Sequence, residues 1–461
     1  MYKKTAPFPR ACYVVNAQRE GANAVRQRHA RKLRSLFFGL LLPVLLGLAS
    51  GLACAAARLS FGGLEWCFTG HSGMLPDAAA ALGPVRRACL PALGGLLAWA
   101  VLRIYKHVGP AEPFTDYGEA VREKHGVIPF GSTAWRTVAS AFSIATGAAI
   151  GREGSMIQFA TACASFLGLR CSRRWAPGPV PLRPPLADMV AWGAAAAVAA
   201  AYQAPVAGVF FASELVLARM RLRDLAPLGI ASCTGWLASR PLLGPGFLFA
   251  APAPLGTPSA SWWWLLLMAP LFGMLGPAYQ WLIRSLGAMR SLPLALVWSG
   301  VAVGLLSLKL PTVWGNGDAA LLSLVHTAGP NAPAVIGTST VLLFRLLATC
   351  LCVGAGVIGG VFTPTLFAGA ALGALFASGI HSPVPLLFIV AGIGCLMAAV
   401  THAPLMTTFM TVELTGKWAL LPLLLLCNLA AWRIAARLSS QSLYGIATSR
   451  PGRAHASPPS P

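Results

Sequence analysis

The sequence predicts an all-α, polytopic membrane protein, because its composition is strongly apolar and its uncharged runs are long. Of the 461 residues, 56% are hydrophobic and only 10% are charged, and the mean hydropathy is +0.67. A soluble domain carries roughly 25% charged residues. No Asp, Glu, Lys or Arg occurs in Leu36 to Ala57, Met189 to Ser213 or Leu346 to Val412. The last run could hold several spans of about 20 residues each, whereas a barrel would show short alternating segments.

A basic lead, residues 1–35, precedes the first apolar run. It carries nine Lys and Arg, and such an excess marks the cytoplasmic side of a membrane. We expect Arg26 to Arg34 to lie as a basic helix against anionic lipid. The lead is too long for a cleavable signal. The whole chain has a net charge of +22, but the basic residues of this lead lie directly before a membrane span. We therefore expect the partner to be a lipid bilayer and not nucleic acid.

Residues 36–447 are expected to form one membrane domain. Gly and Pro interrupt its apolar runs, as in the stretch 353–373. Broken helices leave backbone groups unsatisfied and are tolerated only where protein or a cavity surrounds them. The eleven cysteines are scattered and are interpreted as packing residues. Residues 448–461 are expected to be a disordered tail, and no cofactor or metal site is expected.

An internal repeat is visible in the segments 203–215 and 402–414. Both start with Ala-Pro and end with Glu-Leu, and nine residues separate Pro from Glu in each copy. A Gly-rich break precedes each copy. This pattern predicts a duplicated fold, which in transporters often means two inverted halves with a site between them.

Three carboxylates lie well inside apolar runs: Glu153, Glu214 and Glu413. A charge at the centre of a bilayer costs at least about 2.5 kcal/mol, so such residues usually face a pathway or a partner. Glu214 and Glu413 occupy equivalent repeat positions near helix ends, where a capping or packing role is expected.

Glu153 differs because Gly151 and Gly154 flank it where a helix could begin. The start of a helix attracts anions, so a carboxylate there is a tethered anion that can occupy the place of a mobile one. The alternative is a helix-capping glutamate paired with Arg152.

Other classes of protein are disfavoured. The motif Gly70-His71-Ser72-Gly73 fails the nucleophile pattern of serine hydrolases and is expected to be a turn. The eight histidines show no metal-binding spacing, so we expect no enzyme. An unrelated secondary solute transporter stays open as an alternative.

The motifs together resemble the CLC family of chloride channels and chloride/proton antiporters. Residues 151–154 resemble the family's GREGP motif, with Ser155 in place of proline, and residues 359–364 resemble its GxFxP motif. Tyr444 is placed like the family's tyrosine, and residues 276–280 resemble the start of its second half. Within the family, a divergent bacterial, ClcB-type subgroup is most similar.

The resemblance implies two inverted halves of tilted and broken helices, about 36–246 and 261–438, followed by a C-terminal helix with Tyr444. No CBS domains are expected. It further implies a homodimer in a bacterial inner membrane, with both termini cytoplasmic. Glu153 would gate a passive, voltage- or pH-gated chloride pathway. Chloride or another small anion would bind backbone groups of Val361, Phe362 and Gly154 and the hydroxyl of Tyr444. The pore motif would comprise Gly151, Arg152, Ser155, Gly360 and Pro364.

Two departures from the family pattern bear on function. The family's GSGIP segment has no counterpart near residues 110–117, so no central serine is assigned and anion selectivity stays open. Leu215 stands where family exchangers carry an inner proton-relay glutamate, and the helix expected over 209–220 offers only Ser213 and Glu214 before Arg219. We therefore expect channel-like transport, with a chloride/proton antiporter that relays protons through Glu214 or water as the alternative.

Overall fold

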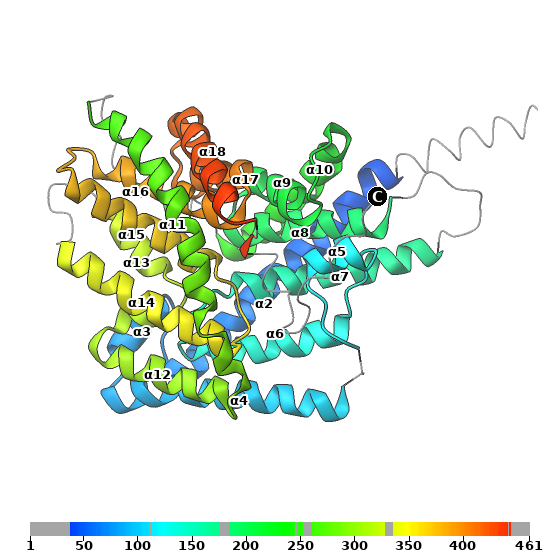
Figure 1. The fold of residues 1–461 in the computed structure, drawn as a ribbon. Coiled ribbons are helices and arrows are strands. Elements are labelled where there is room, and N and C mark those ends of the chain that lie inside the picture. The colour runs from blue at the N-terminus through cyan, green and yellow to red at the C-terminus, as the bar shows by residue number, and fades with distance from the viewer. Residues whose placement is uncertain are drawn as a thin grey trace, which may run out of the picture.

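The computed structural model describes residues 37–109, 112–174, 184–244, 248–251, 260–327, 335–440 and 442–443, and these residues are helical apart from their connections (Figure 1). The elements before residue 245 are η1 (Phe37–Leu41), α2 (Leu42–Thr69), α3 (Leu75–Ala81), α4 (Pro84–Val108), α5 (Tyr117–Glu123), α6 (Phe130–Ala145), α7 (Glu153–Arg174), α8 (Leu186–Tyr202), α9 (Pro205–Phe211), η2 (Ala212–Val216) and α10 (Leu222–Leu243). Those after residue 259 are η3 (Ala260–Trp264), α11 (Leu265–Ser285), η4 (Gly287–Ser291), α12 (Ala295–Lys309), η5 (Pro311–Val313), α13 (Asp318–His326), α14 (Val335–Ala355), α15 (Phe362–Gly379), α16 (Pro385–Thr401), α17 (Pro404–Thr415), η6 (Trp418–Leu420) and α18 (Leu421–Leu438).

Six helical stretches within the described residues are long and apolar enough to cross a membrane. They are Gly39–Thr69, Pro84–Val108, Trp262–Ser291, Val335–Ala355, Phe362–Gly379 and Trp418–Leu438. Of the shorter apolar helices, α8 is buried from Met189 to Tyr202 and α16 from Leu386 to Thr401, and both pack between longer helices. The prediction of an all-α membrane protein with broken helices is confirmed.

The repeat predicted from the sequence is visible in the backbone. Gln203 follows α8 and His402 follows α16, and both residues adopt the left-handed conformation, with φ of 56° and 58°. Such angles are uncommon for residues other than glycine. A helix that starts with proline follows each of them, α9 in one copy and α17 in the other. The two copies therefore share an unusual bend as well as a sequence pattern.

Helix packing follows the same duplication. In the first half α2 packs against α8 and α10, and in the second half α11 packs against α16 and α18. The halves meet through two pairs of equivalent helices, α4 with α12 and α9 with α17. These two pairs lie toward opposite edges of the molecule in Figure 1, α4 and α12 at the bottom and α9 and α17 near the top.

Glu413, near the end of α17, caps a helix of the other half. Its Oε1 and Oε2 accept hydrogen bonds from the backbone N–H groups of Val206 (3.0 Å) and Ala207 (2.7 Å), in the first turn of α9. The first N–H groups of a helix have no partner within it, and water cannot supply one in an apolar interior. The carboxylate therefore satisfies two backbone groups and places its negative charge at a positive helix end.

Glu214 makes the reciprocal contact from the first half. It accepts hydrogen bonds from the N–H groups of Leu405 (3.2 Å) and Met406 (2.7 Å), in the first turn of α17. Between the two caps, the rings of Phe210 and Phe409 stack with centroids 4.7 Å apart and planes 7° apart. Each half therefore caps the start of a helix in the other half, and the equivalent residues Phe210 and Phe409 stack between the two caps.

We predict that Glu413→Leu will destabilise the protein, because two buried N–H groups lose their acceptors. Hydrogen bonds to charged groups contribute about 1.5–3 kcal/mol each. Thermal unfolding in detergent should occur several degrees lower than in the unmodified protein. Glu413→Gln, which keeps an acceptor oxygen, should lose less stability. Equal unfolding temperatures for the leucine variant and the unmodified protein would contradict the cap.

Candidate functional site

The two Gly-rich breaks meet in the middle of the molecule. Gly151 and Gly360 form an antiparallel backbone bridge, in which each N–H donates to the other carbonyl at 2.7 Å. Gly147 and Gly356 precede them at the same spacing, with φ of 108° and 82°. The bridge therefore joins equivalent points of the two halves.

The bridge is close enough to require glycine. A Cβ built on Gly154 would lie 2.8 Å from the Cα of Gly360. Real Cβ atoms essentially never come so near a backbone atom, and glycine is the residue that permits close approach of two backbones. The breaks are thus geometric requirements for bringing the two halves together.

Two helices begin at this bridge, α7 at Glu153 and α15 at Phe362. Gly151 and Gly154 flank the start of α7, as the sequence predicts for a helix beginning at that point. The first N–H groups of α7 and α15 have no partner within their own helix, and each helix start carries about half a positive charge. Their meeting point therefore favours an anion.

The carboxylate of Glu153 lies at this point and is buried, with 6% of the residue exposed. Its Oε1 accepts a hydrogen bond from Nδ2 of Asn316 at 2.7 Å. Its Oε2 accepts none from the described residues, and a Cβ built on Gly151 would lie 2.5 Å from it. An unsatisfied buried acceptor costs about 1–3 kcal/mol, so this anion is held incompletely.

A small cleft lies beside the segment that carries the glutamate. Its lining includes the side chains of Glu65, Arg152, Asn316 and Asp318 together with apolar residues of α3, α6 and the segment before α7. Arg152 interacts electrostatically with Glu153, but no ion pair joins the two within the part of the chain that the structure describes. Asn316, the hydrogen-bond partner of Glu153, is thus part of the cleft lining.

An aromatic ring packs against the start of α15. The ring of Tyr202, at the end of α8, lies 5.0 Å from that of Phe362. Tyr117 and Phe211 lie 6.0 Å apart in the same half of the molecule. The first pair joins the end of α8 to α15, and the second joins α5 to the end of α9.

The remaining predicted residues fall around this centre. Ser155 shares a hydrogen bond of 2.6 Å with Ser140, which also donates to the carbonyl of Ile358. Val361 is the residue before α15, and Pro364 lies in its first turn. Tyr444 lies outside the described residues, so its position stays a prediction.

The segment without a central serine has its own structure. Residues 112–116 have no regular secondary structure, and Oδ1 of Asp116 accepts the N–H of Gly118 at 2.8 Å, which caps α5. Gln158 of α7 bonds to backbone groups of Tyr117 and Thr115. The segment is therefore fastened to α7 through a side-chain amide.

The helix expected over 209–220 is shorter than predicted. It ends in the π-turn η2, and Ala218 adopts a left-handed φ of 49°. Leu215 lies in η2, is buried, and its carbonyl accepts from Arg122 at 3.1 Å. Because the chain turns after η2, Arg219 does not continue the helix face of Glu214.

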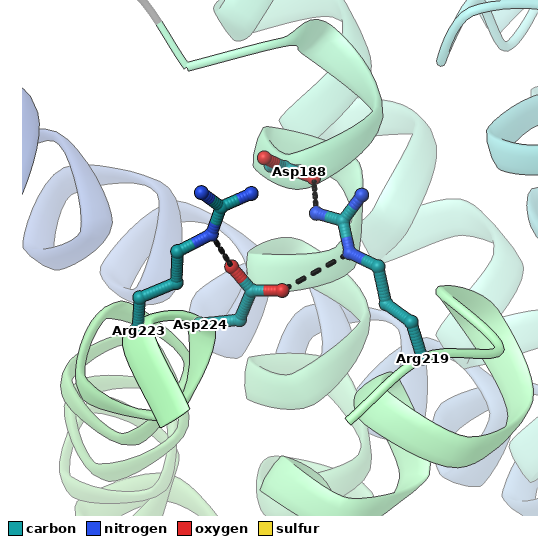
Figure 2. Close-up of polar contacts among 4 residues, drawn as sticks. All are labelled: Asp188, Arg219, Arg223 and Asp224. Atoms are coloured by element: carbon teal, nitrogen blue, oxygen red, sulfur yellow. Dashed lines mark hydrogen bonds and ion pairs between the residues drawn. The ribbon is translucent and has the colours of Figure 1, made fainter. Parts of the chain in front are cut away.

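Arg219 instead belongs to an ion-pair cluster, shown in Figure 2. It contacts Asp188 at 2.6 Å and Asp224 at 3.0 Å, and Arg223 contacts Asp224 at 3.7 Å. Since these residues come from α8, α10 and the connection between η2 and α10, the cluster fastens this turn to both helices.

Two residues of the site, Asn316 and Arg345, are not among those predicted from the sequence. Arg345 is a charge inside an apolar helix, which is a signal visible in the sequence. It is 2% exposed and donates to backbone carbonyls of the segment that carries Asn316. Asn316 stands between two glycines, and nothing local in the sequence links it to Glu153.

Comparison with known proteins adds independent observations. A family model described as voltage gated chloride channel matches residues 94–436. A ClcB-like chloride channel protein of Ralstonia nicotianae is 37% identical over 422 residues, covering 88% of this chain and 95% of the relative. The voltage-gated ClC-type chloride channel ClcB of Citrobacter koseri is 34% identical over 429 residues, covering 89% of this chain and 98% of the relative.

Solved structures share the fold at low sequence identity. A slow cyanobacterial Cl⁻/H⁺ antiporter superposes with a TM-score of 0.73 at 23% identity, covering 90% of this chain and 96% of that one. A CLC-type fluoride/proton antiporter has a TM-score of 0.69 at 21% identity, covering 88% and 96%. At these identities the likeness concerns the architecture alone.

Proposed function

The chain belongs to the voltage-gated chloride channel (CLC) family, and on that premise we propose that it moves chloride across a membrane through a pathway gated by Glu153. The observation that carries this proposal is a buried carboxylate at the start of α7, beside the bridge between Gly151 and Gly360. The carboxylate occupies the place that favours an anion. When Glu153 is protonated or swings away, a mobile anion can take that place.

The anion site is proposed at the two helix starts. Backbone N–H groups of Val361, Phe362 and Gly154 would bind chloride, and Tyr444 would add its hydroxyl, as the family resemblance implies. The site offers partial charges without a full countercharge, so an anion can bind and still leave. Such weak binding is compatible with rapid conduction, because a tightly bound anion would leave the site slowly.

Channel-like transport is favoured over tightly coupled exchange. A proton needs titratable groups or water to reach Glu153 from the far side, and Leu215 offers neither. Both oxygens of Glu214 accept backbone N–H groups of α17, and protonation would remove one of these acceptors. The alternative remains a chloride/proton antiporter that uses Glu214 or water as its inner relay.

The cellular setting is part of the proposal. The basic residues before the first span and the bacterial relatives favour a bacterial inner membrane with both termini in the cytoplasm. A homodimer, with a separate pathway in each subunit, is proposed from the family resemblance. The halves 36–246 and 261–438 would each supply one of the helix starts.

Replacing Glu153 with Gln should speed chloride flux and weaken its dependence on pH, because the tethered charge is removed. The measurement is chloride efflux from liposomes containing purified protein, at several external pH values. Glu123→Gln, on the exposed face of α5, serves as a control and should behave like the unmodified protein. Unchanged flux and pH response in the Glu153 variant would leave Glu153 with a capping role only.

Proline at position 361 should weaken chloride binding strongly, because proline has no backbone N–H. Calorimetry on a variant shown to be folded by gel filtration measures the affinity. Tyr444→Phe should weaken binding only modestly, since the backbone donors remain. Equal affinity in a folded Val361→Pro variant would place the site elsewhere.

A chloride gradient should drive no uphill proton movement. Liposomes with a chloride gradient and no electrical shunt, monitored by external pH, measure this coupling. Proton pumping that disappears in Glu153→Gln would support the antiporter and point to Glu214 or water as the relay.

A further inference from the structure

Asn316 is the one side-chain donor to the Glu153 carboxylate among the described residues. It lies between η5 and α13 in the second half of the chain, 163 residues from Glu153, and its Nδ2 donates to Oε1 at 2.7 Å. Both residues are buried, with 7% and 6% of their surface exposed. A contact across such a separation in sequence depends on the fold of both halves.

The orientation of the Asn316 amide is fixed by a second contact. Its Oδ1 accepts the backbone N–H of Asp318 at 3.2 Å. An amide has one acceptor oxygen and one donor nitrogen, so with the oxygen engaged by an N–H donor, the NH₂ group must face Glu153. The flanking Gly315 and Gly317 have φ of 77° and 100°, a conformation that favours glycine.

The buried guanidinium of Arg345, from α14, holds the segment that presents Asn316. It donates to the carbonyls of Thr312, Trp314 and Gly315, the last at 2.8 Å. A Cβ built on Gly317 would lie 3.0 Å from this guanidinium. The segment is therefore fixed from the α14 side.

The other side of the segment packs against the approach to α7. Trp314 is fully buried, and a Cβ built on Gly147 would lie 2.4 Å from its ring. Thr349, one turn beyond Arg345 on α14, donates to the carbonyl of Ala149 at 3.0 Å. Because it is held on both sides, Asn316 cannot follow Glu153 when the glutamate side chain swings out.

We propose that Asn316 is a positioning residue for the gate. Its fixed amide holds the ionised Glu153 carboxylate in the blocking position, and Arg345 supports it from behind. This inference rests on the proposed function of Glu153. Protonation or rotation of Glu153 then breaks one defined hydrogen bond, and the strength of that bond sets how often the pathway opens.

Other charged and titratable groups act on the same carboxylate. Arg152, on its own segment, and Asp318, at the start of α13, interact with it electrostatically. Arg58 and Cys54 of α2 do so from a second side, and Glu65 acts on Arg152. The variants at position 316 keep all of these side chains, so these charged and titratable groups are common to the variants and the unmodified protein.

The test compares Asn316→Leu with the unmodified protein in the chloride-efflux assay. Leucine has the same branching at Cγ and no donor, so the ionised carboxylate loses stabilisation and takes up a proton more readily. We expect flux at neutral pH to rise by about tenfold or more and half-maximal flux to occur at a higher pH. Asn316→Ser, which restores a donor in a smaller side chain, should recover part of the original pH profile.

We call the hydrogen bond from Asn316 to Glu153 the latch. Two further variants distinguish loss of the latch from a general structural effect. In a Glu153→Gln background, Asn316→Leu should add nothing, because the charge that the amide holds is gone. Asn428→Leu removes another buried amide, which donates to Thr408 at 2.9 Å, and should leave the pH profile unchanged. Gel filtration and thermal unfolding establish that each variant is folded.

The outcomes distinguish the latch from the gate itself. A folded Asn316→Leu variant with the original flux and pH profile overturns the latch, as does an equal rise in flux in the Glu153→Gln background. If Glu153→Gln alone leaves flux and pH response unchanged, the gate is wrong and the latch falls with it.

Discussion

Helices that begin inside a bilayer leave backbone N–H groups without partners, and the arrangement of this protein depends on how those groups are satisfied. At α9 and α17 the carboxylates of Glu413 and Glu214 supply the acceptors, each from the opposite half. At α7 and α15 no such pair of caps is present in the described residues. Glu153 occupies that place with a single side-chain donor on one oxygen. The first N–H groups of α9 and α17 thus have carboxylate acceptors. At the central bridge, where transport is proposed, the helix starts have only the incompletely held carboxylate of Glu153.

Much of this architecture could be predicted from the sequence. Low charge and long uncharged runs predict the helical membrane class, and the matched Pro–Glu spacing predicts the duplication. The glycines around Glu153 predict the start of α7, because they mark a break where backbone can approach backbone. The spacing could not show that Glu214 and Glu413 each cap a helix of the opposite half, since a carboxylate near a helix end can equally well cap a helix of its own half. The helix expected over 209–220 was wrong because a π-turn and the left-handed Ala218 end it early.

The polar partners of the site were harder to predict. Asn316 reaches Glu153 only because Arg345 and Trp314 hold its segment between α14 and the approach to α7. No local pattern carries that information, because the contact joins residues from different halves. Arg345 did carry a signal, since a charge in an apolar run costs free energy and needs partners.

The exchange of caps also has a consequence for synthesis. Glu214 and α9 leave the ribosome well before α17, which holds the other half of both contacts. At about 5–20 residues per second, roughly 10–40 s pass before the second half can complete the pair. During that interval the nascent first half exposes an uncapped helix and an unpartnered carboxylate within the membrane. Insertion of this chain is therefore a task for machinery that shelters an incomplete half, and two separately produced halves would each lack a component that only the other supplies.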